Sequence, residues 1–155
     1  MRTFKLFILC AGICATLLSS LTSCGSKKKK VDQRAAAEKA ITKDLHDVMH
    51  TALNTATAGF GSMVANAVLT EQEQDSIMVS PVLPYIRTSL DKASDEEVAK
   101  LVKDKNERFK FLGKCMLENK DVIQKQISGG MAVGGEIVNV AVAELEKLKI
   151  TQKAE

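Results

Sequence analysis

The chain has 155 residues, one Tyr, five Phe and no Trp, and its length is that of a single domain. The formal net charge is +3, but six of the 22 Lys and Arg residues precede Val31. The remaining 16 face 19 Asp and Glu, so the chain from Val31 onward has a net charge of −3. Nucleic-acid-binding domains present a basic surface and stacking aromatic side chains, so this composition argues against nucleic acid as a partner.

The first 23 residues have the pattern of a secretory signal peptide. Arg2 and Lys5 form a positive head, residues 6–18 are uncharged and largely apolar, and small residues lead up to Ser23. This order is typical of a signal that is cleaved. The apolar run is shorter than the about 20 residues that a spanning helix needs. An uncleaved anchor helix is therefore the weaker alternative.

The segment LTSC, residues 21–24, resembles the lipobox of bacterial lipoproteins: an aliphatic residue, two small residues and a cysteine. The resemblance covers residues 1–24 only and implies cleavage between Ser23 and Cys24. It also implies a diacylglycerol on the Cys24 thiol and an acyl chain on the new amino terminus. Each buried methylene contributes about 0.8 kcal/mol, so two or more chains would anchor the protein without a spanning helix. The alternative is ordinary cleavage near Ser23 that leaves Cys24 a free thiol.

A polybasic tether is expected over residues 24–31, where the four consecutive lysines are Lys27, Lys28, Lys29 and Lys30. Near an anionic leaflet each lysine could contribute about 1 kcal/mol, although a solvated spacer is the simpler interpretation. In some bacterial lipoproteins an Asp after the lipidated Cys signals retention in the inner membrane; here that residue is Gly25. In others an acidic run marks export to the cell surface; here the run is basic. The resemblance therefore implies the periplasmic face of the outer membrane.

Residues 32–155 predict an all-α fold, a small antiparallel bundle of four or five helices. The first helix is predicted over residues 32–58, with Asp32 as its N-cap. Gly59 and Gly61 are expected to bend or interrupt it, before the helical pattern resumes with Met63, Val64, Ala67 and Val68. One face of this helix carries residues at steps of three and four, namely Ile41, Leu45, Val48, Ala52 and Thr55.

Two capping-box patterns predict later helix starts. Thr70 with Glu73 begins one helix, which prolines at 81 and 84 interrupt before a short helix that runs to about residue 93. Ser94 with Glu97 begins another, predicted to run about 30 residues and to stop at Gly129-Gly130. Its broad apolar face carries Val98, Leu101, Val102, Phe109, Leu112, Cys115, Met116, Ile123 and Ile127.

The last segment, residues 131–150, has both helical and alternating spacing. We favour a helix, because a single strand would have no partner. Gly130 and Gly134 have a GxxxG spacing, which could let the first and last helices approach closely or could mark a hinge. Three cysteines lie in or next to the signal, so Cys115 can form no disulfide within the mature chain. We expect it to be a small buried apolar residue, with an intermolecular bridge as the alternative.

The segment HDVMH, residues 46–50, is the one motif that suggests chemistry. His46 and His50 are four residues apart, so both imidazoles project from one side of a helix, as in zinc proteases of the HExxH type. Asp47 stands where the general-base Glu would be, and Glu71 or Glu73 could supply a third ligand. Asp is one methylene shorter than Glu, however, and no strand is evident to hold a substrate. We therefore expect ordinary surface or rim histidines with zinc binding of about micromolar affinity or weaker, and no peptidase activity.

These patterns together predict a lipid-anchored helical envelope protein with a non-enzymatic interaction or structural role. Its expected partners are the membrane, through the anchor, and another envelope protein. Beyond the covalent acyl groups no cofactor is expected. One alternative is a metal-binding or zinc-dependent hydrolytic lipoprotein that uses His46, Asp47 and His50. The other is a carrier of a small apolar ligand, in a core cavity lined by residues such as Met63, Phe109 and Met116.

Overall fold

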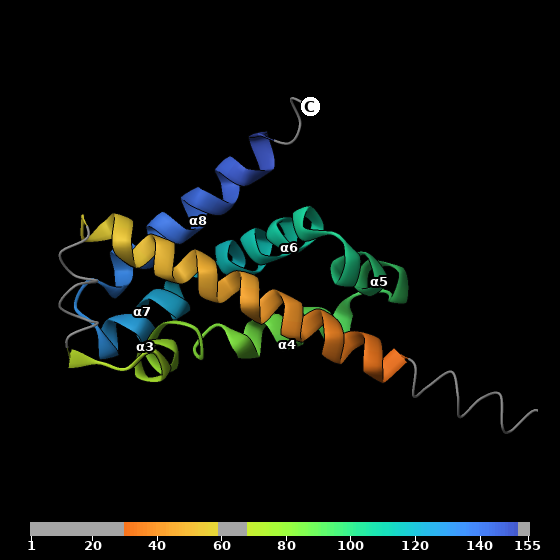
Figure 1. Ribbon diagram of the computed structural model, residues 1–155, viewed down its shortest axis with the longest axis horizontal. Helices are drawn as coiled ribbons and strands as arrows, with labels where there is room; N and C mark the ends of the chain where they lie inside the picture. The colour runs from red at the N-terminus through yellow and green to blue at the C-terminus, as the bar shows by residue number, and fades with distance from the viewer. Residues whose placement is uncertain (1–29, 59–67, 152–155) are drawn as a thin grey trace, which may run out of the picture.

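The computed structural model describes residues 30–58 and 68–151, and the regular structure in these residues is entirely helical (Figure 1). This confirms the all-α prediction and the helical assignment of the last segment. None of the described helices combines the length and apolar character needed to cross a bilayer. The helices are an N-terminal helix of residues 30–56, α3 (Glu71–Met78), α4 (Leu83–Lys92), α5 (Asp95–Lys103), α6 (Lys105–Glu118), α7 (Lys120–Gly130) and α8 (Gly134–Thr151).

The helices enclose one aliphatic core. α6 and α7 both pack on α8, α4 and α5 pack on α6, and α3 packs on α7. The N-terminal helix lies across this group (Figure 1), with its first turns near α4 and α5 and His50, near its other end, beside α3. Its inward face is formed by Ala37, Ile41, Leu45, Val48, Met49, Ala52 and Leu53, all buried. The predicted face is therefore confirmed except at Thr55, which is exposed.

The start of the N-terminal helix differs from the prediction. The helix already includes Lys30, so Asp32 lies inside its first turn and is not its N-cap. The Lys30 Nζ lies 2.5 Å from Asp95 Oδ2, and Arg34 donates to the carbonyl oxygens of Leu90 and Ala93. These contacts tie the first turn to the junction of α4 and α5. Lys30 and the next residue thus belong to the helix rather than to a separate tether. The expected interruption at Gly59 and Gly61 lies outside the described residues.

Both capping boxes are confirmed. Glu73 accepts a hydrogen bond of 2.8 Å from the backbone N–H of Thr70, and Glu97 accepts one of 2.8 Å from that of Ser94. Each backbone hydrogen bond favours the charged carboxylate and so lowers the pKa of its Glu. The break at the two prolines is also confirmed, because α3 ends at residue 78 and the second proline lies in the first turn of α4.

The single long helix predicted from Ser94 onward is wrong, because the segment forms α5, α6 and α7. The Asp104 side chain accepts from the backbone N–H groups of Asn106 and Glu107, at 2.8 and 3.4 Å, and so begins α6 as an N-cap. Asn119 interrupts the chain again between α6 and α7 and donates to the Cys115 carbonyl oxygen at 2.8 Å. All the predicted apolar residues except Val102, which is partly buried, are nevertheless buried, now on three helices.

The GxxxG spacing joins α7 to α8 rather than the first helix to the last. Gly130 ends α7 and Gly134 begins α8. A Cβ on Gly134 would lie 2.6 Å from the backbone N of Ser128 and 2.7 Å from the carbonyl carbon of Ile127. Such distances are closer than van der Waals contact, and backbone atoms cannot rotate away. The absence of a side chain at Gly134 is therefore what lets the start of α8 lie against α7.

We predict that Gly134→Ala destabilises the domain by about 1–3 kcal/mol, as overpacking does elsewhere. Gly129→Ala is the matched control, since a Cβ there would meet nothing within 4 Å. Urea unfolding of residues 25–155, followed by circular dichroism, measures both. Equal midpoints for the two variants would show that α7 and α8 do not make this close approach.

A buried ion pair connects the N-terminal helix to α6. Asp44 is 5% exposed, and its Oδ2 accepts from Arg108 Nε at 2.5 Å. Arg108 also donates through Nη1 to the Leu101 carbonyl oxygen, at 3.1 Å. A buried charge is strongly destabilising unless it is paired and hydrogen-bonded. The pair therefore restricts how the N-terminal helix can pack on α6.

Asp44→Ala should destabilise the domain by about 3–5 kcal/mol, because it leaves a buried guanidinium without its partner. Replacing both members, as Asp44→Leu with Arg108→Met, should recover most of that loss. Glu38→Ala is the comparison, since it removes a more exposed pair with Arg87 that contributes about 0–1 kcal/mol. Urea midpoints of the four proteins decide the matter. A double variant no more stable than Asp44→Ala would mean that the site tolerates no apolar filling.

Candidate functional site

His46 and His50 lie one turn apart on the N-terminal helix, and both side chains are partly buried. Their ring centroids are 4.2 Å apart and the ring planes are tilted by 33°. The four-residue spacing has therefore brought the two imidazoles side by side, as we expected. What the spacing alone does not indicate is which groups they face.

Asp75 of α3 faces both imidazoles. Its Oδ1 lies 3.1 Å from His50 Nε2 and 3.4 Å from His46 Nε2. The three residues could together hold a metal ion, since one ligand atom from each falls within 4.8 Å of the others. The expectation of weak zinc binding rested on the lack of an evident third ligand, and Asp75 removes that premise.

Of the two carboxylates proposed as third ligand, one lies at the site and one does not. Glu71 Oε1 is 3.3 Å from His46 Nε2, although the Glu71 side chain is 76% exposed. Glu73 instead completes the cap of α3 through Thr70. Asp75 was missed, although it follows Glu71 by four residues and so had to share its helix face. Helical spacing within EQEQD was the signal that could have identified it.

Asp47 does not lie where a general base would act. Its Oδ1 is 3.5 Å from His46 Nδ1, the ring nitrogen on the opposite side of the imidazole from Nε2. In an HExxH site the acidic residue faces the metal-bound water. Here the Asp47 carboxylate is instead placed to orient the ring, as carboxylates do behind metal-bound histidines.

No protein-family model, curated protein or solved structure matches the chain.

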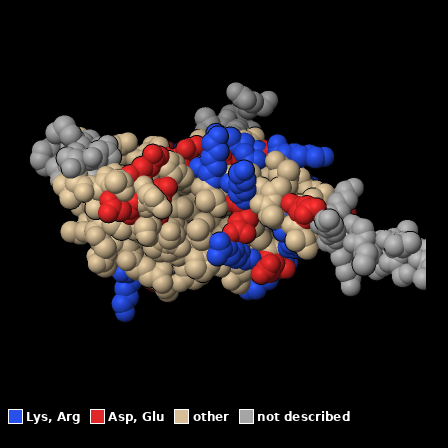
Figure 2. All heavy atoms as spheres, turned by 60° about the horizontal axis from the view of Figure 1, so that its bottom comes forward, with Lys and Arg blue, Asp and Glu red and all other residues tan. Residues whose placement is uncertain are grey.

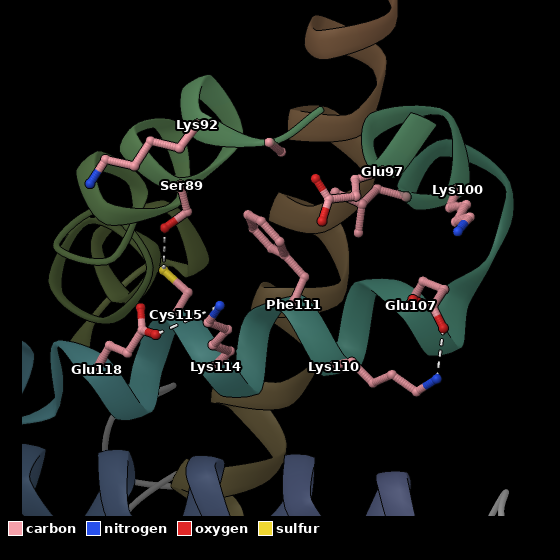
Figure 3. Close-up of a pocket in the computed structure, with 12 residues that line it drawn as sticks. Ser89, Lys92, Glu97, Lys100, Glu107, Lys110, Phe111, Lys114, Cys115 and Glu118 are labelled. Carbon is pink, nitrogen blue, oxygen red and sulfur yellow. Dashed lines mark hydrogen bonds and ion pairs between the residues drawn. The ribbon is translucent and has the colours of Figure 1, made fainter. Parts of the chain in front are cut away.

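A surface hollow of about 490 Å³ forms a second feature, between α4, α5 and α6. Phe111 projects into it, and the surrounding charges are mixed: Lys110 lies 2.6 Å from Glu107, and Lys114 lies 3.9 Å from Glu118 (Figure 3). Figure 2 likewise shows acidic and basic side chains interleaved near the middle of one face of the molecule. The rim is therefore not a site of one charge sign that would attract an ion.

Cys115 lies at the inner edge of this hollow and is buried, as we expected from the sequence. Its Sγ accepts a hydrogen bond from Ser89 Oγ at 3.8 Å (Figure 3). Burial raises the pKa of the thiol, so the thiolate needed for nucleophilic chemistry is disfavoured. Burial also opposes the intermolecular disulfide that we considered.

The cavity expected for an apolar ligand is not this hollow. Phe109 and Met116 are buried in the core and do not line it, while Met63 lies outside the described residues. Ser23, Cys24 and the first three tether lysines also precede the described residues. The lipidation site therefore stays a prediction from the sequence.

Proposed function

We propose that the chain is a lipid-anchored helical envelope protein of the periplasmic face of the outer membrane, with a non-enzymatic role in protein interaction or envelope structure. The observation that carries this proposal is the sequence LTSC at the end of a signal-like segment. Two or more acyl chains on Cys24 would attach the protein stably to the membrane, whereas a single chain would bind only weakly and reversibly.

The short distance from the anchor to the domain supports an interaction role close to the membrane. Five residues, 25–29, separate Cys24 from the first described helical residue. Lys30 is paired with Asp95, and this contact lowers the pKa of the Asp95 carboxyl. Lys27, Lys28 and Lys29 are then the basic residues of the tether that could meet anionic headgroups.

The arrangement of side chains also favours a non-enzymatic role. The buried Cys115 is held as a thiol, and Asp47 lies behind His46 rather than beside a position for metal-bound water. The zinc-hydrolase alternative needs a base on the Nε2 side of the histidines. Asp75 and Glu71, the carboxylates found there, are better placed as ligands.

We predict that Cys24→Ala abolishes lipidation and leaves the precursor uncleaved at this site. Mass spectrometry of the mature amino terminus, after density-gradient separation of the membranes, measures both properties and the location. Cys115→Ala is the matched control and should leave processing and outer-membrane location unchanged. A wild-type amino terminus without acyl chains would contradict the proposal.

A further inference from the structure

We propose that His46, His50 and Asp75 bind a zinc ion that fastens α3 to the N-terminal helix, and that the exposed Glu71 side chain rotates to complete a tetrahedral site. Each helix contributes two residues four positions apart, so each pair shares one face of its helix. Sites built from facing helices in this way are a common means of holding metals in helical bundles. The site goes beyond the proposed function, which requires no metal.

Three of the distances between ligand atoms agree with those around one tetrahedral ion. Ligand atoms 2.0–2.1 Å from a tetrahedral zinc lie about 3.3–3.4 Å from one another. The measured separations are 3.1 Å for His50 Nε2 to Asp75 Oδ1, 3.4 Å for His46 Nε2 to the same oxygen, and 3.3 Å for His46 Nε2 to Glu71 Oε1. The ligand atoms of His46, His50 and Asp75 lie within 4.8 Å of one another, so these three could hold a metal with little movement of the backbone, whereas Glu71 lies outside this group and would reach the ion through rotation of its exposed side chain.

A simple hydrogen bond explains only part of this arrangement. His50 Nε2 and Asp75 Oδ1 meet hydrogen-bond geometry, whereas His46 Nε2 lies at ion-pair distances from the same oxygen and from Glu71. In the absence of metal, imidazole N–H groups can donate to these carboxylates. On binding, the metal takes the place of those protons and bonds to the same nitrogen and oxygen atoms.

The surroundings also fit a metal site. Asp47 lies 3.5 Å from His46 Nδ1, where it would orient the ring once Nε2 binds the ion. Imidazole and carboxylate ligands suit zinc, and the one described cysteine, Cys115, lies on α6, away from the site. The side chains of His46, His50 and Asp75 are partly buried, so the ion would be shielded on one side and reachable from solvent.

The structural consequence is a cross-link between segments separated in the sequence. α3 has eight residues, of which only Gln74 and Met78 are buried, so its apolar anchorage is small. Zinc would add a bond from α3 to the N-terminal helix and would oppose local opening of α3. The site is thus inferred to have a structural role.

The test is zinc binding by the full-length chain, purified in detergent and stripped of metal with EDTA. We expect one zinc per chain with a dissociation constant tighter than about 1 μM, because three or four ligands are available instead of two. His50→Ala and Asp75→Asn should each weaken binding by at least about 10-fold, the smallest loss typical even of groups behind the ligands. Asp91→Asn, an exposed Asp of α4, is the matched control and should bind as the wild type does.

Two further measurements address geometry and role. Cobalt(II) in place of zinc should give the intense visible absorption of a tetrahedral complex, and Glu71→Gln, at an exposed position, should alter that spectrum without unfolding the protein. Zinc should also slow amide hydrogen exchange of α3 in the wild type and not in Asp75→Asn. The proposal is overturned if the wild type retains no zinc, if Asp75→Asn binds as tightly as the wild type, or if the cobalt spectrum is octahedral.

Discussion

The buried pair between Asp44 and Arg108 is the constraint on which the position of the N-terminal helix depends. A carboxylate and a guanidinium removed from water must remain together, since separating them leaves an uncompensated charge in a medium of low dielectric constant. Arg108 is itself held by the carbonyl oxygen at the end of α5. The N-terminal helix therefore has to pass over α6 at the level of Asp44, whatever the aliphatic residues around it would tolerate.

Other polar contacts lie in sequence order along the same helix. Lys30 and Arg34 meet the α4–α5 junction, Asp44 meets α6, and His50 meets α3. A helix rises 1.5 Å per residue, so the first and last of these contacts are about 30 Å apart. Under the proposed function, the lipid anchor would precede the start of this helix, and the inferred zinc site would lie about four to five turns along it.

What the sequence predicted correctly was mostly local. The Thr70–Glu73 and Ser94–Glu97 capping boxes are contacts over three residues, and local spacing suffices to identify them. The same pattern occurs at Asp104 and Glu107 but was overlooked, because apolar residues continue at helical intervals on both sides of it. Apolar residues recur at the same intervals whether the segment forms three short helices or one long helix. Only the capping residue distinguishes these two arrangements in the sequence.

The candidate site required information that spacing does not contain. His46 and His50 were identified as neighbours on one helix, but their convergence on Asp75 depends on how α3 docks 25 residues later in the chain. The Asp44–Arg108 pair, whose members are 64 residues apart, could not be predicted from the sequence for the same reason. Each of these polar residues resembles an ordinary surface charge until the tertiary arrangement is known.

The polar contacts also specify something that the core does not. The inward face of the N-terminal helix is built of Ala, Ile, Leu, Val and Met, and aliphatic cores accept several packings of similar volume. A slip of one turn would move the helix by 5.4 Å. It would then bring another aliphatic residue to most of these places in the core, but would carry Asp44 beyond hydrogen-bonding reach of Arg108. The same slip would place one histidine where the other now lies and would carry the second away from Asp75, so the register that pairs the buried charges is the one that brings both histidines to α3.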